Sequence, residues 1–158
     1  MKLSSDIFSV FEKGWALATA GTPEDFNTMT IGWGSAGTLW GKDTVTVYIK
    51  PCRYTHDYME KNEYFTVSFF PESCRKALVL LGTKSGRDGD KVAESGLTPI
   101  SVGEGKAVSF AEAEQTVLCR KIYRQELDAA ACPPEVREAF YAEEAPHTVY
   151  VGEVTAIL

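Results

Sequence analysis

Polar and apolar residues alternate over several short segments of this chain, and a period of two is typical of β-strands with one buried face. The run TVTVYI at 44–49 alternates without a break and is followed by Lys50 and Pro51. Strands are therefore expected over 15–21, 26–33, 44–50, 63–70 and 147–158, with shorter extended pieces over 97–102 and 106–110. The run 113–127 has the composition of a helix, but its β-branched and aromatic residues favour a strand.

Apolar residues at helical spacing separate some of these strands. Ile7, Val10 and Phe11 indicate a short helix over 5–13. Further helices are expected over 53–61 up to Asn62, over 73–81 from a Ser73 cap to Gly82, over 88–95 up to Gly96, and from Pro133-Pro134 to Tyr141.

The first strands are joined by short turns, which indicates an antiparallel meander. A sheet of this kind leaves unpaired edges unless it closes on itself. We therefore expect a mainly β fold, a six- to seven-stranded antiparallel barrel with helices on its outside.

Composition limits the functional classes. A chain of 158 residues and 17.4 kDa fits one domain, so 1–158 is expected to be a single domain. The net charge of -6 argues against a general nucleic-acid binder, so any site for a phosphate must be local. The N-terminus lacks the apolar run of a signal peptide, and no segment approaches the about 20 apolar residues of a membrane span. These features favour a cytoplasmic protein without membrane contact.

The four cysteines and two histidines show no metal-ligand spacing, so no metal site is expected. In a reducing compartment the cysteines are free thiols. Cys119 lies in an apolar run and is expected to fill the core. Cys52 precedes Arg53 and is either a reactive thiol or simply a packed one. The acidic pair Glu143-Glu144 is expected to lie on a solvated face.

Two motifs indicate a bound mononucleotide. The run NTMTIGWGS at 27–35 places an amide and small hydroxyls on a strand of little bulk, which suits the polar edge of a flat heterocycle. Arg53, Tyr54 and Thr55 follow a strand that ends at Pro51, where the N–H groups of a new helix can hold a phosphate.

A second cluster also suits a phosphate. Lys84, Ser85 and Arg87 surround Gly86, whose backbone freedom would let the loop close on a ligand, although an ordinary solvated turn has the same composition. Lys91 is close enough in sequence to reach the same site, or it is a solvated lysine.

The run GWGSAG at 32–37 matches the dinucleotide-binding pattern GxGxxG, but its context does not. Residues 38–43 are broken by Gly41 and lead into another strand, whereas the fingerprint must open a helix. We interpret these glycines as a turn or bulge that lets a ligand approach the backbone.

With GTKSGRD at 82–88 and the strand YFTVSFF at 64–70, these motifs resemble the flavin reductase-like family of FMN-binding split barrels, in its flavoredoxin-like branch. The resemblance covers about residues 14–154. It implies an antiparallel split β-barrel that binds FMN. The residues implied to face the ring edge are Asn27, Thr28, Met29 and Thr30. Trp33 would pack on the ring or ribityl chain, unless it is a core aromatic.

The resemblance also implies a homodimer with FMN near the subunit interface. A histidine just before the last strand is frequent in NAD(P)H-dependent members, and His147 matches that position, so it would line the nicotinamide side. Three functions remain open: an FMN-dependent oxidoreductase that uses NAD(P)H, an electron carrier that serves an unknown redox partner, and a non-catalytic barrel that binds another planar ligand or a protein.

Overall fold

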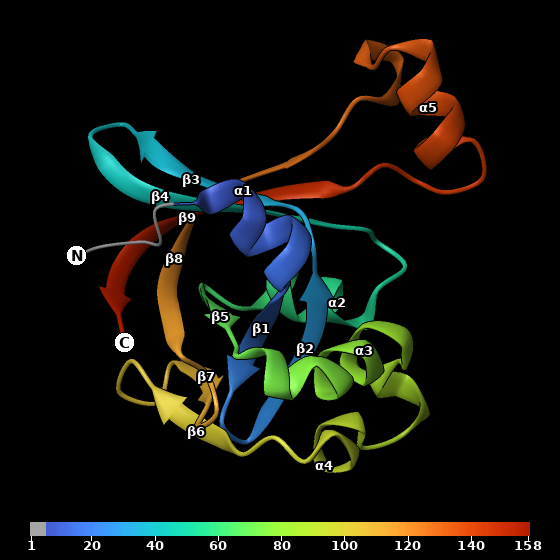
Figure 1. The fold of residues 1–158 in the computed structure, drawn as a ribbon. Coiled ribbons are helices and arrows are strands. Elements are labelled where there is room, and N and C mark those ends of the chain that lie inside the picture. The colour runs from blue at the N-terminus through green and yellow to red at the C-terminus, as the bar shows by residue number, and fades with distance from the viewer. Residues whose placement is uncertain (1–5) are drawn as a thin grey trace.

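The computed structural model describes residues 6–158, which are dominated by one antiparallel sheet of seven strands (Figure 1). The strand order is β2-β1-β5-β8-β9-β4-β3. In chain order these strands are β1 (Ala16–Thr22), β2 (Asp25–Ile31), β3 (Gly34–Leu39), β4 (Lys42–Ile49), β5 (Tyr64–Phe69), β8 (Gln115–Glu126) and β9 (Thr148–Ile157). The prediction of a mainly β, antiparallel split barrel is confirmed.

The sheet is not the simple meander that the short turns suggested. Only β1–β2, β3–β4 and β8–β9 are pairs of strands that follow one another along the chain, and the other pairs bring together β1 with β5, β5 with β8, and β4 with β9. The edge strands β2 and β3 are neighbours in sequence, joined only through Gly32 and Trp33, yet they are not paired with each other. The barrel is therefore split between β2 and β3.

Strand β3 differs from the sequence-based expectation. We interpreted its glycines as a turn or bulge, but they form an edge strand paired with β4 from Gly34 to Leu39. A tight turn at Trp40 and Gly41, with φ of 53° and 72°, joins the two strands as a hairpin. Gly34 is needed for packing, because a Cβ atom there would lie closer than 3.0 Å to the ring of Phe11.

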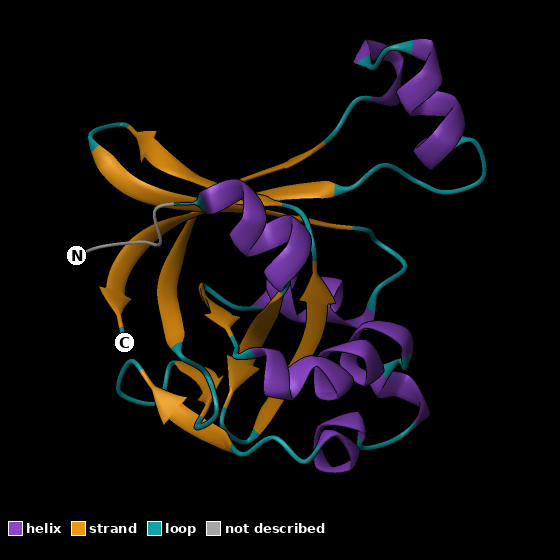
Figure 2. Cartoon of the chain, viewed as in Figure 1, coloured by secondary structure: helices purple, strands orange, loops and turns teal. Residues whose placement is uncertain are grey.

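Helices and a second small sheet cover the outside of the barrel (Figure 2). The helices are α1 (Ile7–Ser9) with the π-helical turn Val10–Gly14, α2 (Tyr54–Lys61), α3 (Arg75–Thr83), α4 (Lys91–Ser95) and α5 (Pro134–Tyr141). Three 3-10 turns, Glu72–Cys74, Gly86–Asp88 and Ala129–Ala131, precede α3, α4 and α5. The small sheet pairs β6 (Pro99–Val102) with β7 (Ala107–Phe110). None of these helices is long and apolar enough to cross a membrane.

Two helix boundaries correct the prediction. Helix α3 runs through Gly82 to Thr83 and begins without a Ser73 cap, since the 3-10 turn after Pro71 takes that place. Gly82 lies inside the helix rather than after it, and it packs closely on β2, since a Cβ atom there would meet the side chain of Thr30 at 3.1 Å. Helix α4 begins at Lys91 rather than residue 88, since Gly89 at φ 144° separates it from the preceding turn. Of the first predicted helix, Ser5 lies outside the described residues.

The strand over 113–127 is confirmed as β8, and Gly96 closes α4 in the left-handed conformation as expected. Cys119 is buried in β8, and all four cysteines are free thiols.

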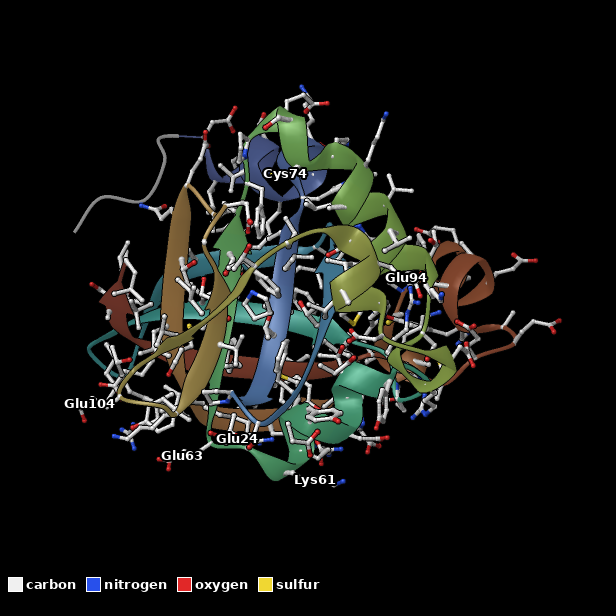
Figure 3. The ribbon with its side chains drawn as sticks, turned by 90° about the horizontal axis from the view of Figure 1, so that it is seen from below. Glu24, Lys61, Glu63, Cys74, Glu94 and Glu104 are labelled. Atoms are coloured by element: carbon white, nitrogen blue, oxygen red, sulfur yellow. The ribbon has the colours of Figure 1, made fainter. Side chains whose placement is uncertain are left out.

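The side chains of β1 alternate between two cores. Ala16, Ala18 and Ala20 face the barrel interior, where they pack among Met29, Ile31 and other apolar residues. Leu17 faces the opposite way and packs against α3 through Leu78 and Leu81. Charged side chains such as Glu24, Lys61, Glu63, Glu94 and Glu104 lie around the periphery (Figure 3). Burial on both faces of β1 fixes its register and holds β2 and α3 in place around the site described next.

Candidate functional site

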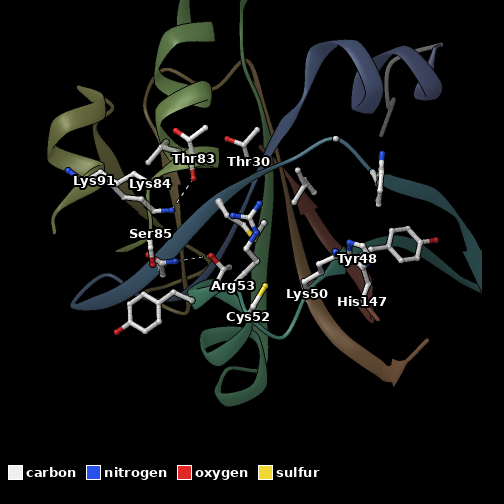
Figure 4. A pocket seen from close by; sticks show the side chains of 18 of the residues that line it. Thr30, Tyr48, Lys50, Cys52, Arg53, Thr83, Lys84, Ser85, Lys91 and His147 are labelled. Carbon is white, nitrogen blue, oxygen red and sulfur yellow. Dashed lines mark hydrogen bonds between the residues drawn. The ribbon is translucent and has the colours of Figure 1, made fainter. Parts of the chain in front are cut away.

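A cavity of about 570 Å³ lies next to the split between β2 and β3. Its walls come from β2, the end of β4, the first turn of α2, the end of α3 with the loop after it, and the segment before β9 (Figure 4). Most of the predicted site residues line it: Asn27, Met29, Thr30, Trp33, Arg53, Tyr54, Thr55, Lys84, Ser85, Lys91 and His147. The fold therefore brings the two sequence motifs to one place.

Three predicted residues do not line this cavity. Thr28 is fully buried on the far side of β2, where its hydroxyl lies 2.7 Å from that of Thr19. By strand alternation Asn27 and Met29 point the other way and line the cavity, whereas Thr30, on the same face as Thr28, reaches the cavity near the end of β2. Gly86 and Arg87 lie just outside the cavity, and Arg87 is held against α2 through Asp57 at 2.8 Å.

Strand β2 forms the floor of the cavity. Asn27 is buried and donates from Nδ2 to the hydroxyl of Thr55 at 2.8 Å, which ties β2 to the first turn of α2. Thr30 also lines the cavity, but its hydroxyl donates to the carbonyl of Leu78 at 2.6 Å. Thr30 thus anchors α3 to the cavity wall. Past Ile31 the strand ends, and the backbone around Gly32 lies at the cavity surface.

Helix α2 points its N-terminus toward the cavity. Arg53 is the cap residue, but no side chain caps the helix there. The backbone N–H groups of the first turn, at Tyr54 and Thr55, lack an intrahelical partner by the geometry of any α-helix. Such N–H groups, together with the helix dipole, favour an anion. The guanidinium of Arg53 is exposed and forms no ion pair with any described residue.

Lys91 lies on the same side of the cavity, and the interpretation of it as a solvated lysine is wrong. Its side chain is 4% exposed, and its ammonium group donates to the carbonyl of Leu81 at 2.9 Å. Burial, followed by the positive charge of Arg53, lowers the pKa of Lys91 to about 8. Within residues 6–158 no carboxylate pairs with it. A buried cation without a counter-charge is costly, so this end of the cavity favours an anion.

The opposite end of the cavity is built around His147. Figure 4 shows Arg53 near the middle, with Lys84, Ser85 and Lys91 on one side and Lys50 and His147 on the other. His147 is buried, and its Nδ1 atom lies 2.9 Å from the hydroxyl of Tyr141 on α5. Burial and then the charge of Lys50 lower the pKa of His147 below its usual value, so the imidazole is neutral at pH 7.

Trp33 lies beside His147 and is not a core aromatic. Its side chain is 51% exposed. Its ring packs edge-on against Phe140 and tilted against His147, with ring centres 5.3 Å and 5.4 Å apart. The cavity is therefore cationic at one end and aromatic at the other.

The family model described as "Flavin reductase like domain" matches residues 8–158 of this chain. The chain belongs to the flavin reductase-like family. A search of curated proteins found no match.

Solved structures of the same fold include members of this family. Flavoredoxin from Methanosarcina acetivorans aligns with a TM-score of 0.73 and 21% identity, over 100% of this chain and 75% of that one. An FMN-binding protein from Thermus thermophilus, solved with bound 1-cyclohex-2-enone, aligns with a TM-score of 0.73 and 19% identity, over 100% and 76%. The NADH:FAD oxidoreductase SgcE6 from Streptomyces globisporus C-1027 aligns with a TM-score of 0.70 and 18% identity, over 92% and 74%.

The sequence did not point to several residues that line the cavity of this flavin reductase-like chain. Lys50 and Glu144 form an ion pair at the His147 end, and Lys50 also donates to the carbonyl of Phe140 at 3.2 Å. Glu144 therefore belongs to the cavity wall rather than to a solvated face alone. The others are Ile31, Tyr48, Cys52, Leu81 and Thr83, while Gly32 lines the cavity in the glycine run that was expected to let a ligand approach the backbone.

One signal for Lys50 was available, since it ends an alternating strand beside the Arg53 motif. Nothing in the sequence indicates that the loop before His147 would fold back onto Lys50. In the part of the chain that the structure describes, no three His, Cys, Asp or Glu side chains gather to hold a metal ion.

Proposed function

We propose that this protein binds FMN in the cavity between β2, α2 and α3 and acts as an oxidoreductase through it. The bound flavin would be reduced either by NAD(P)H or by a redox partner that remains to be identified. Flavoredoxin and the FMN-binding protein from Thermus thermophilus, which share the fold, support this choice of cofactor.

The observation that best supports FMN binding is the cationic end of the cavity. Lys91 is buried there without a carboxylate partner among the described residues, Arg53 is likewise unpaired, and both lie beside the uncapped N-terminus of α2. A phosphate monoester would satisfy all three at once, because it carries close to two negative charges and three acceptor oxygens. Riboflavin, which lacks the phosphate, would leave them unsatisfied.

The rest of the cavity fits a flat ring. Its volume of about 570 Å³ lies within the range of roughly 300–1,000 Å³ that is usual for cofactor sites. Asn27, Thr30 and the backbone near Gly32 offer polar groups along one wall, and Trp33 supplies an aromatic face. Met29 and Leu81 give the site apolar surface that excludes water from a bound ring.

When bound, a flavin supplies the hydride and electron transfer. The residues of this chain would then bind and orient it. Neutral His147, held by Tyr141 through Nδ1, would present its Nε2 side to whatever approaches the ring. We favour NAD(P)H as the electron donor, with its nicotinamide ring beside His147.

We also propose that the protein is a homodimer with the flavin near the subunit interface. Exposed aromatic side chains beside the cavity support an interface there, since Trp33 is 51% exposed and packs on Phe140, which is 43% exposed. Sedimentation velocity at micromolar protein with bound FMN tests this proposal. A dimer is expected, and a monomer that retains FMN fully would contradict it.

The visible spectrum of the purified protein is the first test of FMN binding. We expect flavin absorbance after reconstitution, and a dissociation constant at least about tenfold lower for FMN than for riboflavin, since a charged hydrogen bond contributes about 1.5–3 kcal/mol. Equal affinity for the two flavins would refute the phosphate site. Stopped-flow bleaching of the bound flavin by NADH or NADPH then separates a pyridine-nucleotide oxidoreductase from an electron carrier.

A further inference from the structure

A second cavity of about 340 Å³ adjoins the cationic end of the first. The two cavities share Asn27, Tyr54 and Lys91 in their walls, so the second begins where the proposed phosphate site ends. Its other walls come from Phe26, Tyr58 and the turn between the 3-10 helix and α4. A volume of this size lies at the lower end of the usual range for small ligands, which is roughly 300–1,000 Å³.

Gly86 packs against the wall that the two cavities share. It packs so closely on its neighbours that a Cβ atom there would lie closer than 3.0 Å to Oδ1 of Asn27 and 3.0 Å from the ring of Tyr54. Asn27 itself is fixed by its hydrogen bond to Thr55. No ligand group can pass between Gly86 and this wall unless the segment Ser85–Asp88 moves away from α2.

Arg87 holds that segment in place through three separate contacts with α2 and the residues before it. Its Nη2 atom donates to the carboxylate of Asp57 at 2.8 Å, and Nη1 donates to the carbonyl of Cys52 at 3.2 Å. The guanidinium also lies over the ring of Tyr54, 4.6 Å from its centre. These contacts use the hydrogen-bonding groups of Arg87 outside the first cavity, which accounts for its absence from the cavity wall.

The neighbouring residues hold the same segment from the other side. Lys84, just before the segment, pairs with Glu94 of α4 at 2.6 Å, and within the segment the hydroxyl of Ser85 accepts from the backbone N–H of Arg87 at 3.2 Å. The loop is thus tied to α2 at one end and to α4 at the other.

From this geometry we infer that Arg87 makes the site selective for a flavin mononucleotide over a flavin dinucleotide. The inference rests on the proposed function. FMN ends at its phosphate, which the cationic end of the first cavity would hold. FAD carries an adenosine phosphate beyond that point, and this extension would have to displace Gly86 and break the contacts of Arg87 to enter the second cavity. Arg87 is therefore a positioning residue that keeps Gly86 against the shared wall.

The test compares dissociation constants of FMN and FAD, measured by flavin fluorescence titration, for wild type and three variants. Arg87→Ala removes all three contacts, and Asp57→Asn weakens one of them while keeping the Arg87 side chain. Arg75→Ala is the matched control, because Arg75 also stacks on an aromatic ring, that of Trp15 at 3.5 Å, and donates to the carbonyls of Lys13 and Gly14, but away from both cavities. Thermal unfolding confirms that each variant folds.

We expect wild type to bind FMN at least about tenfold more tightly than FAD, which corresponds to about 1.4 kcal/mol. Arg87→Ala should reduce this ratio by about five- to tenfold, chiefly by tighter FAD binding, since it removes a partly exposed ion pair and a cation–π contact together. Asp57→Asn should shift the ratio in the same direction by less, and Arg75→Ala should leave it unchanged.

The outcomes separate this inference from the proposed function. If wild type binds FMN and FAD equally, or if neither Arg87→Ala nor Asp57→Asn changes the ratio, the inference is wrong while FMN binding stands. If wild type binds no FMN, the proposed function fails and the inference with it.

Discussion

The hydroxyl of Tyr141 on α5 lies 2.9 Å from Nδ1 of His147, the residue that precedes β9. Because this bond occupies Nδ1, Nε2 is the ring nitrogen left for the cavity. The bond also connects the site to the extension that carries α5, which stands away from the barrel at the ends of β8 and β9 (Figure 1). Lys50 reinforces the connection from β4 through the carbonyl of Phe140 and the carboxylate of Glu144.

Replacing Tyr141 with Phe is expected to slow flavin reduction without weakening FMN binding. The substitution keeps the ring but removes the hydroxyl that orients His147. Losing one hydrogen bond of about 1 kcal/mol should lower the rate of reduction by the active pyridine nucleotide about fivefold, while the dissociation constant of FMN stays within about twofold. Stopped-flow absorbance measures both. Tyr64→Phe, on β5 and away from the cavity, is the control. An unchanged rate in Tyr141→Phe would mean that His147 does not act on the ring.

Removal of the Arg53 side chain is expected to weaken FMN binding by about 1.5–3 kcal/mol, the range for hydrogen bonds to charged groups. Riboflavin affinity should change by less, because riboflavin offers no phosphate to the guanidinium. Isothermal titration of Arg53→Ala with both flavins measures the difference. Lys61→Ala, at the other end of α2, removes an exposed cation outside the cavity and should affect neither. Equal losses for the two flavins would show that Arg53 supports the fold rather than the phosphate.

Much of the fold was predictable because alternation and turn residues are local signals. Strands β4 and β5 and helix α2 fall close to their predicted ranges. Strand β3 was missed, since Gly34 and Gly37 carry no strand propensity of their own and the strand forms only because β4 pairs with it. The order of the sheet was also out of reach, because the pairing of β4 with β9 joins residues about a hundred positions apart.

The site also contains residues that the sequence predicts and residues that it does not. Asn27 and Arg53 lie in motifs whose residue types match their chemistry, so they were found directly. The burial of Lys91 depends on how α4 packs on α3, which a solvated-looking segment does not reveal. Thr28 was placed in the site with the rest of the run 27–30, but its hydroxyl packs against Thr19, whereas Thr30 on the same face reaches the cavity.

Valine substitutions at Thr28 and Thr30 test this placement. Thr28→Val should lower the free energy of unfolding by about 1–3 kcal/mol, because it leaves the buried hydroxyl of Thr19 without its partner. FMN affinity should stay within about twofold. Thr30→Val removes the bond to Leu78 that anchors α3 beside the cavity, so stability and FMN affinity should both fall. Urea unfolding and FMN titration give the two quantities. A loss of FMN affinity in Thr28→Val with unchanged stability would reverse this assignment.

The last prediction concerns Lys91, whose pKa is lowered to about 8 by burial and by the charge of Arg53. In the protein without ligand, the unfolded chain binds more protons than the folded one between about pH 8 and the usual lysine value near 10.4, so this residue makes stability rise with pH across that interval. A bound phosphate reverses the preference, since it pairs with the charged ammonium. The phosphate of FMN is already a dianion above pH 7, because its second pKa is about 6.

FMN affinity should therefore fall as pH rises through about 8, while the stability of the ligand-free protein rises because of the same group. In Lys91→Met both changes should be lost, and FMN affinity should be lower than wild type at pH 7 and nearly constant up to pH 9. FMN titrations and urea unfolding between pH 6.5 and 9.5 measure affinity and stability, with Lys61→Met as the control, since Lys61 is an exposed lysine at the far end of α2, outside the cavity. If wild-type affinity stays level through pH 8 to 9.5, Lys91 does not hold the phosphate, and the cationic end of the cavity must bind FMN through Arg53 and the N-terminus of α2 alone.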